Sequence, residues 1–418
     1  MKDDLPVDAP DDIQPISRGL LSSVADWIMD AAIVDLPIQE LMGGVCVRLL
    51  AAGVPVDRAH ISYRTLHPAI EAVSLVWQRG EDVRLVPQEH GAGNSAIWRR
   101  SPFFYMIEND LPTFRRRLIG EDRIMDFLLL DDLVEEGVTD YLALNTKFDG
   151  GAADATGRVN GLLTSWATKR PSGFAEADIA ALLRVKQRLA VAAKLAIRKQ
   201  IAENVVDTYL GHRAGREVLS GHIQRGDGRS IHAVVWYSDL RGSSALADNL
   251  PAGKYIALLN GYFECAAGAV VEAGGEVLNY IGDGVLAVFP IDGEDRGRSA
   301  AEAALAAAVE ARRRLRDVNE NLTAVGADPL DFGVGLHSGN VVFGNIGAGA
   351  RLAFTTIGSA VNEVARIEEA CKSLKRPILA SGEFRAMLSA ASAATFQGHG
   401  FKQLRGIGAP VDLYCLDD

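Results

Sequence analysis

Two aspartates stand where apolar, strand-like stretches end, and together they could hold divalent cations. Asp239 closes the apolar run 234–238, and Asp283 lies in the segment 281–284 between two further apolar runs. The second pattern predicts a β-hairpin with a tight Gly/Asp turn. If the two strands pair, the carboxylates meet at one end of a sheet, where cations could activate a hydroxyl and neutralise phosphate charge. Taken alone, an aspartate at a hairpin tip is also explained by turn chemistry.

Small residues begin three positions after Asp239, at the predicted start of a helix. Gly242, Ser243 and Ser244 offer free N–H groups of the kind that hold polyphosphate oxygens. The alternative interpretation is a serine that only caps the helix.

A third stretch, residues 355–369, opens a helix after Gly358. Asn362 and Arg366 are four residues apart and therefore share a helix face. A neutral amide and a fixed cation aimed at one point suit the orientation of a ribose and the stabilisation of phosphate charge. A surface ion pair between Arg366 and Glu363 or Glu369 is the competing interpretation. With the two aspartates, this pair favours phosphoryl or nucleotidyl transfer.

The elements around these residues predict an α+β domain. Strand and helix alternate through the segments 231–238, 253–273, the hairpin, 298–318 and 331–339. This is the ferredoxin-like split βαβ order, an antiparallel sheet with helices on one side. In that fold the end of the first strand and the tip of the central hairpin are neighbours, which brings Asp239 and Asp283 together.

The first half of the chain has a different pattern. A helical pattern runs from Leu20 to Leu50, and paired strands, a helix at 123–136 and a long helix at 176–210 follow. We therefore expect a separate N-terminal domain over residues 1–195, with a mobile acidic tail up to about residue 14. A helical linker over residues 196–230 follows, and a catalytic domain occupies residues 231–418. In the linker helix, apolar residues form a stripe suited to a parallel two-chain coil, namely Leu195, Ile201, Val205 and Tyr209.

Composition limits the function further. A chain of 418 residues is expected to hold two or three domains, and a net charge of −11 argues against a general nucleic-acid binder. A nucleotide substrate is compatible with that charge, because bound cations can reverse its sign locally. The four cysteines contain no CxxC pair, so neither a zinc site nor a disulfide framework is predicted. With no secretory signal and no apolar run of roughly 20 residues, we expect a cytoplasmic protein without a membrane span.

Four ordered motifs, at residues 237–242, 274–284, 333–347 and 357–366, resemble those of the class III nucleotidyl cyclases. The similarity covers about Ile231 to Leu416. The resemblance implies that ATP is converted to 3′,5′-cyclic AMP and pyrophosphate by attack of the ribose 3′-hydroxyl on the α-phosphate. It also implies two Mg²⁺ or Mn²⁺ ions and a head-to-tail homodimer whose chains share each site.

The family's functional residues can be carried over by position. Asp239 and Asp283 match the metal aspartates, and Leu240 would lend its backbone carbonyl. Asn362 and Arg366 match the pair that orients the ribose and stabilises the transition state. Arg405 lies near the position where a lysine usually meets the terminal phosphates.

Some positions depart from the family pattern. Asn279 stands where adenylate cyclases usually carry a lysine that reads adenine. The second base-reading position is usually an aspartate or a threonine, and Thr355 fits the threonine variant. Guanylate cyclases usually carry glutamate at the position of Asn279. Gly333 stands where an arginine is common, and Ser243 and Ser244 replace phenylalanine and threonine. An asparagine amide can donate and accept, so it can face either purine. The alternatives are therefore a cyclase that prefers GTP or a pyrimidine nucleotide, and a nucleotide-binding sensor without catalysis.

Residues from about Leu36 to Ala193 resemble a GAF-type sensor domain, with PAS as the nearest rival. Candidate ligand contacts are His60, Trp77, Tyr105 and residues 115–117, although core aromatics and a basic surface run also explain them. The resemblance implies a regulatory domain whose ligand is unknown.

Overall fold

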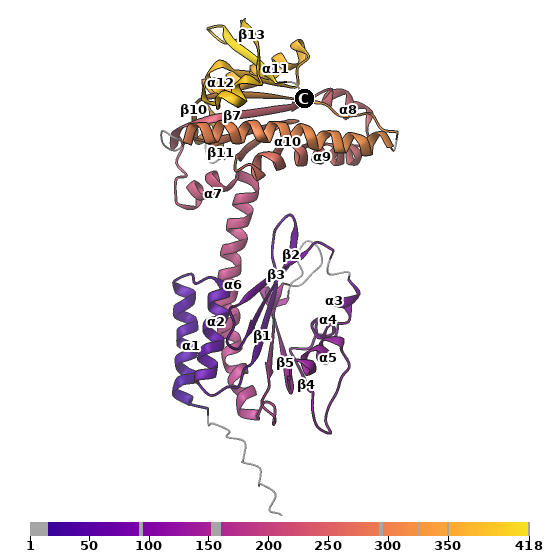
Figure 1. Ribbon diagram of the computed structural model, residues 1–418. Helices are drawn as coiled ribbons and strands as arrows, with labels where there is room; N and C mark the ends of the chain where they lie inside the picture. The colour runs from indigo at the N-terminus through magenta and orange to yellow at the C-terminus, as the bar shows by residue number, and fades with distance from the viewer. Residues whose placement is uncertain are drawn as a thin grey trace, which may run out of the picture. The chain divides into compact units, whose positions relative to one another are not determined.

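The computed structural model describes residues 16–91, 95–151, 160–291, 296–324, 326–348 and 351–416. The predicted mobile tail, residues 1–14, lies outside this part. The chain divides into two compact units, the first ending at Val205 and the second beginning at Val206 (Figure 1).

The first unit is built on a six-stranded antiparallel sheet with the order β3-β2-β1-β6-β5-β4. Alternation along β1 divides its side chains between the two faces, and Ala59, Ile61 and Tyr63 enter the larger core. The strands are β1 (Arg58–Arg64), β2 (Ile70–Gln78), β3 (Arg84–Glu89), β4 (Thr113–Arg117), β5 (Asp140–Lys147) and β6 (Gly161–Thr168).

Helices cover both faces of this sheet. One face packs against α1 (Arg18–Ile33), α2 (Ile38–Ala51) and α6 (Glu176–Leu210), and Trp77 belongs to that core. A smaller core on the other face joins α4 (Pro102–Glu108) and α5 (Leu128–Glu135), and α3 (Ala96–Arg99) packs beside α4. Figure 1 shows these two groups of helices on opposite sides of the strands.

The predicted helical stretch 20–50 is two helices rather than one. Asp35 has a φ of 56°, and Pro37 starts the second helix, so the chain turns between Ile33 and Ile38. The helix predicted at 123–136 begins later, at Leu128, whereas the long helix 176–210 has the predicted bounds.

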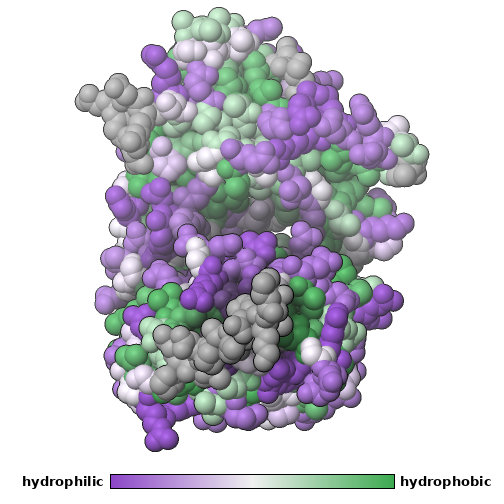
Figure 2. All heavy atoms as spheres, turned by 60° about the horizontal axis from the view of Figure 1, so that its bottom comes forward, coloured by the Kyte–Doolittle hydropathy of each residue, from purple (hydrophilic) through white to green (hydrophobic). Residues whose placement is uncertain are grey.

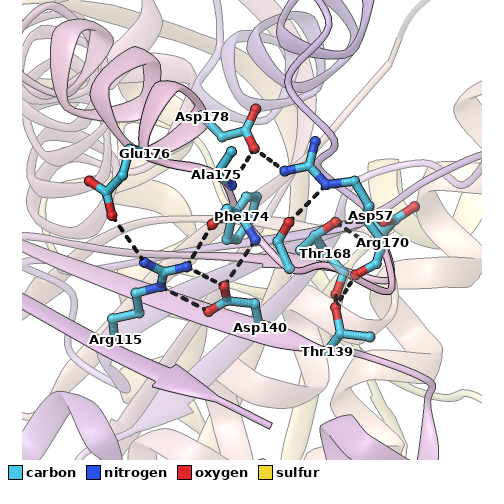
Figure 3. Close-up of polar contacts among 11 residues, drawn as sticks. Asp57, Arg115, Thr139, Asp140, Thr168, Arg170, Phe174, Ala175, Glu176 and Asp178 are labelled. Carbon is cyan, nitrogen blue, oxygen red and sulfur yellow. Dashed lines mark hydrogen bonds and ion pairs between the residues drawn. The ribbon is translucent and has the colours of Figure 1, made fainter. Parts of the chain in front are cut away.

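A network of charged hydrogen bonds fixes the start of α6 (Figure 3). The buried Asp140 on β5 accepts hydrogen bonds from Arg115 Nη2 at 2.6 Å and from the backbone N–H of Phe174 at 2.9 Å. Asp178 pairs with Arg170 and accepts from the N–H of Ala175 at 2.7 Å. The loop before α6 is thereby tied to the sheet, and Arg115 has a structural role rather than the ligand contact considered from sequence.

The second unit contains an eight-stranded sheet with the order β13-β14-β12-β10-β7-β9-β8, and β11 pairs with β10. The pairs are antiparallel except β10–β12, which is parallel, so the sheet departs from the wholly antiparallel one predicted. The strands are β7 (Gly228–Leu240), β8 (Glu276–Ile281), β9 (Gly284–Pro290), β10 (Phe332–Ala348), β11 (Arg351–Ile357), β12 (Ile378–Ser381), β13 (Gln397–Lys402) and β14 (Val411–Leu416).

The two faces of this sheet carry different helices. Val234 and Trp236 face α9 (Ala252–Glu272) and α10 (Arg296–Ala324), which lie side by side in Figure 1. Ala233 and Val235 face the opposite way, against α11 (Ser359–Leu374). The sequence predicted helices on one side of the sheet only. The structure has α9 and α10 on that side and α11 on the opposite side. The shorter helices are α7 (His212–Leu219), α8 (Ser243–Asn249), α12 (Gly382–Met387) and α13 (Ala390–Ala394).

On the face in Figure 2, hydrophilic side chains interrupt the hydrophobic ones. Within the described part of the chain, every helix is too short or too polar to cross a membrane.

Candidate active site

The two aspartates predicted to meet do lie at one end of the sheet. Asp239 is the penultimate residue of β7 and pairs with Gly284, the residue that follows Asp283 in the β8–β9 hairpin. Gly282 has a φ of 64° and begins a two-residue turn, which is the position where type II′ turns favour glycine. Gly284 also leaves room for a neighbour, because a Cβ there would collide with the Tyr237 hydroxyl and force that side chain to shift.

The charges of this pair are poorly compensated by the protein. Burial, followed by repulsion from Asp283, raises the pKa of Asp239 to about 6, and Arg241 opposes the shift. Two carboxylates in this position repel one another until a cation or a proton neutralises them. The pair is therefore electrostatically prepared to bind a cation.

The donor set fits Mg²⁺ or Mn²⁺. Leu240 pairs with Phe332 of β10, while the pairing of β7 with β9 ends at Asp239, so the Leu240 backbone lies at the sheet end beside the two carboxylates. Carboxylate and carbonyl oxygens suit these hard cations, which keep several waters and bind substrate phosphates as well. Among the described residues there is no cluster of three or more acidic, histidine or cysteine side chains placed to hold a metal. The ligands available to a cation here are therefore the two aspartates, the Leu240 carbonyl and the phosphates of a substrate.

A third carboxylate, which the sequence analysis did not identify, lies close to this pair. Glu368 of α11 is buried, and burial together with Asp239 raises its pKa to about 7. Arg241 forms ion pairs with two carboxylates: its Nη2 is 3.9 Å from Glu368, and its Nε is 3.4 Å from Asp331. The departure at Gly333 explains this arrangement: a Cβ there would collide with Glu368 and come within 2.6 Å of Arg241 Nη2. Glycine thus leaves the space that Arg241 and Glu368 occupy.

Asn362 and Arg366 lie on α11 but not on the side that faces the aspartates. Both side chains are partly or fully exposed, and Arg366 Nη1 donates to Glu369 at 2.7 Å. Glu368, two residues from Arg366 and so about 200° around the helix, is the residue that points toward Asp239. Within one chain the predicted transition-state pair is therefore separate from the predicted metal pair.

The residues predicted to select the base lie on two strands. Asn279 is exposed on β8, just after a bulge, and pairs with Leu286 of β9. The Leu286 side chain lies on the sheet face that packs against α11, which is also the face of Asp239. Thr355 lies on β11, opposite Gly344 of β10, rather than on the helix itself. The structure thus places Asn279 on the sheet face that carries the Asp239 carboxylate.

The residues predicted to hold phosphates are partly or fully exposed. Gly242 precedes α8 with a φ of 70°, and Ser243 and Ser244 form the first turn of that helix. Arg405 is exposed in the loop between β13 and β14.

The sheet end is supported from below by a buried hydroxyl pair. Ser238, next to Asp239, lies 2.6 Å from the hydroxyl of Tyr262 on α9, and both side chains are buried. Because this bond fixes β7 against α9, it helps to hold the backbone that carries Asp239 in place.

Residues 229–417 match the family model of the adenylate and guanylate cyclase catalytic domain. The chain is 34% identical over 209 residues to an uncharacterized protein of Mycobacterium tuberculosis, a match that covers 47% of this chain and 37% of the relative. It is 31% identical over 151 residues to an adenylate cyclase of Anabaena cylindrica, covering 35% of this chain and 29% of the relative. The chain thus spans well under half the length of these curated relatives.

Solved structures of cyclases also resemble part of the chain. The adenylyl cyclase CyaB from P. aeruginosa is 26% identical with a TM-score of 0.40, covering 46% of this chain and 96% of that one. The guanylyl cyclase Cya2 is 30% identical with a TM-score of 0.39, covering 46% and 93%. From the family match, residues 229–417 form an adenylate and guanylate cyclase catalytic domain.

Proposed function

We propose that this protein is a class III adenylate cyclase that converts ATP to 3′,5′-cyclic AMP and pyrophosphate. The observation that carries the proposal is the pairing of Asp239 with the Asp283 hairpin at one sheet end, inside a stretch that matches the cyclase catalytic domain. The ribose 3′-hydroxyl oxygen forms a bond to the α-phosphorus, the bond from that phosphorus to the α,β-bridging oxygen breaks, and the hydroxyl proton is released. Pyrophosphate leaves with the bond electrons.

Asp239, Asp283 and the carbonyl of Leu240 would hold two Mg²⁺ or Mn²⁺ ions. When bound, these ions lower the pKa of the hydroxyl and neutralise charge on the phosphates. Asn362 orients the ribose, and Arg366 stabilises the charge that develops on the transferring phosphate. Arg405 and the backbone of Gly242, Ser243 and Ser244 bind the remaining phosphates.

A head-to-tail homodimer would combine the two halves of the site. Arg366 is paired with an exposed glutamate on its own helix, on the side away from Asp239. A second chain approaching that side could accept Arg366 and Asn362 beside its own aspartates. The separation of the two pairs within one chain supports this arrangement.

Adenine recognition would fall to Asn279 and Thr355. The Asn279 amide can accept from the adenine N6 group and donate to N1, and the Thr355 hydroxyl can take part in the same edge. The similarity to a protein named as an adenylate cyclase favours ATP. GTP is the alternative, because the same amide can be presented to guanine in the opposite orientation.

Regulation would come from the first unit, as in a cytoplasmic signal-transduction protein with a GAF-like sensor. The helix α6 begins in the first unit and ends at Leu210 in the second, so it would act as the transducer. Its ligand-dependent state would set the rate of the cyclase domain.

Product analysis tests the activity. The purified chain is incubated with ATP, GTP, CTP or UTP in the presence of Mn²⁺, and cyclic nucleotide is identified by mass spectrometry. Cyclic AMP as the main product supports the proposal, and a preference for GTP would reassign the base. If no triphosphate gives a cyclic product while nucleotide still binds, the protein is a nucleotide-binding sensor without catalysis.

Complementation tests the shared site. Asp239→Ala and Arg366→Ala homodimers should each be inactive, and exchanging subunits at equal concentration makes half of the dimers mixed. Each mixed dimer has one complete site and one site that lacks both residues, so about a quarter of the wild-type activity should return. No recovery, with mixed dimers shown to form, would contradict the head-to-tail arrangement.

A further inference from the structure

The first unit contains a cavity of about 830 Å³ between its sheet and the helices α3, α4 and α5. Its floor is formed by β1, β2, β5 and β6, and its roof by α3 and α4 with one residue of α5. This volume is in the range of sites for small organic molecules.

The floor of the cavity is polar although helices cover it. Along β1, Arg58, His60 and Ser62 line the cavity, while the alternate residues pack into the core on the other face. Ser74 of β2 lies opposite Ser62, with the two hydroxyls 3.5 Å apart. Covering polar side chains costs free energy unless they find partners, so a polar floor under helices indicates that the missing partner is a ligand or water.

Arg58 is a charged group in the floor whose charge is poorly compensated. Its side chain is 15% exposed, and its nearest described carboxylate oxygen, on Glu136, is 3.9 Å from Nε, too far for a hydrogen bond. Among the described residues, Arg58 Nε has no hydrogen-bond partner. Burial lowers the pKa of Arg58, but a guanidinium stays protonated in proteins. An anion in the cavity would supply the missing partner.

His60 lies two residues after Arg58, on the same face of β1. Its imidazole would stay neutral beside an anion bound to Arg58. Burial, assisted by the charge of Arg58, lowers the pKa of His60 to about 3. Its Nε2 is also buried with no partner in the described part of the chain. A neutral imidazole next to Arg58 can donate or accept a hydrogen bond without adding charge.

The other charged residues around the cavity are already engaged or lie at its rim. Arg64, the last residue of β1, also lines the cavity and is engaged in an interaction of its own. Lys147 forms an ion pair with Asp110, and Glu71 accepts a hydrogen bond from the N–H of Gly91 at 3.2 Å. Arg99 and Glu108 are exposed and carry opposite charges. Arg58 therefore gives the interior its preference for an anion.

The roof is apolar and aromatic. It is formed by Ile97, Trp98, Phe103, Phe104 and Ile107. The ring of Phe103 stacks on His60 with centroids 5.3 Å apart, and Trp98 meets Phe104 edge to face at 6.2 Å. Flat apolar groups gain most from such a surface, through both burial and ring contacts.

We propose that this cavity binds a small organic anion with a flat aromatic or apolar body, its acidic group on Arg58 beside His60 and its body against Trp98, Phe103 and Phe104. The inference names the ligand class of the regulatory unit in the proposed function and rests on that proposal for its regulatory role. The cyclase reaction needs none of these residues, so a failure of probe binding and a failure of cyclic-nucleotide synthesis are distinguishable.

A pair of fluorescent probes that differ in one charged group tests the proposal on the full chain. The probe 8-anilino-1-naphthalenesulfonate carries a sulfonate, and N-phenyl-1-naphthylamine has the same aromatic body without it. We expect saturable binding of the sulfonate at one site per chain. In Arg58→Gln, the ratio of sulfonate to neutral-probe affinity should fall about tenfold or more, the size expected for a lost charge-assisted hydrogen bond. Arg58→Lys should keep most of the anion preference.

Two further variants make the test decisive. Ser74→Phe fills the cavity from a strand position that tolerates an aromatic residue, and it should abolish the site for both probes. Arg188→Gln removes an exposed arginine on α6 and should change neither affinity. Circular dichroism checks that each variant is folded; if Arg58→Gln is not, Arg58→Ala takes its place with the same expected ratio. An unchanged ratio in the folded Arg58 variant, unchanged binding in Ser74→Phe, or no saturable sulfonate binding to the wild-type chain would each overturn the proposal.

Discussion

The helix that carries Asn362 and Arg366 lies so close to the sheet that only glycine fits beneath it. A Cβ added at Gly335 of β10 would be 2.7 Å from the carbonyl oxygen of Val364 and 3.0 Å from the amide nitrogen of Glu368. Both are backbone atoms of α11, so they cannot swing aside as a side chain can. Gly335→Ala should therefore push α11 away from the sheet by roughly half an ångström or more, at a cost of about 1–3 kcal/mol.

Hydrogen–deuterium exchange of the intact protein measures this cost locally. Peptides from α11 should exchange about 5 to 150 times faster in Gly335→Ala, the factor that corresponds to 1–3 kcal/mol. Because Asn362 and Arg366 move with the helix, kcat should also fall, by up to about 100-fold for a displacement approaching 1 Å. Peptides from α1 and α2 should be unaffected, since they belong to the first unit.

Gly333→Ala is the matched control, two residues away on the same face of β10. The three atoms nearest to its added Cβ are the ends of the Glu368 and Arg241 side chains and Cys371 Cβ at 3.1 Å, and none of these is a backbone atom of α11. Those ends can move, so exchange of α11 should change by no more than about twofold. Equal effects of the two substitutions, or no effect of Gly335→Ala on either exchange or kcat, would refute the argument from helix packing.

Three further predictions follow from the charges and the site. In metal-free protein the folded state keeps a proton on Asp239 that the unfolded chain releases, because the folded pKa is about 6 and the usual one is about 3.9. The free energy of unfolding should therefore decrease as pH rises from 4 to 7, and Asp239→Asn should flatten this slope in urea titrations; a slope of the opposite sign contradicts the shift. Asn279→Lys should raise the ratio of ATP to GTP turnover several-fold in competition assays, and an unchanged ratio would remove position 279 from base selection. Asp140→Asn should destabilise the first unit by about 3 kcal/mol in thermal unfolding, because the buried carboxylate that holds Arg115 is lost and only the exposed Glu176, 3.9 Å away, still pairs with that arginine. Asp126→Asn removes a carboxylate that is 38% exposed and should cost less than about 1 kcal/mol; similar losses would contradict the role of carboxylate burial.

Local patterns were sufficient to predict much of the second unit. The alternation before Asp239 and the glycines around Asp283 determine two strands and a tight turn, and their pairing follows from the split βαβ order. The long helix 176–210 was predicted with the observed bounds, because its periodic pattern is uninterrupted over ten turns or so.

Features that depend on packing between distant segments were not predicted. Glu368 joins Asp239 only because α11 lies on β10 at Gly335, a contact that has no signature in the local sequence. The strand β10 continues to Ala348, well past the predicted end at 339, because its glycine-rich second half is held by pairing with β7 and β11. The parallel pairing of β12 with β10 likewise depends on the path of the chain between them. In each case tertiary contacts override a weak local preference.

The network that anchors the start of α6 also bears on the order in which the chain folds during synthesis. Its members lie between Asp57 and Asp178, and the longest link, from Lys169 N–H to Asp57, spans 112 residues. Such links form only after the strands have assembled, so the first turn of α6 should become stable late in the folding of the first unit. All of these partners precede Val205, so the first unit can complete this step while the ribosome is still translating the cyclase domain.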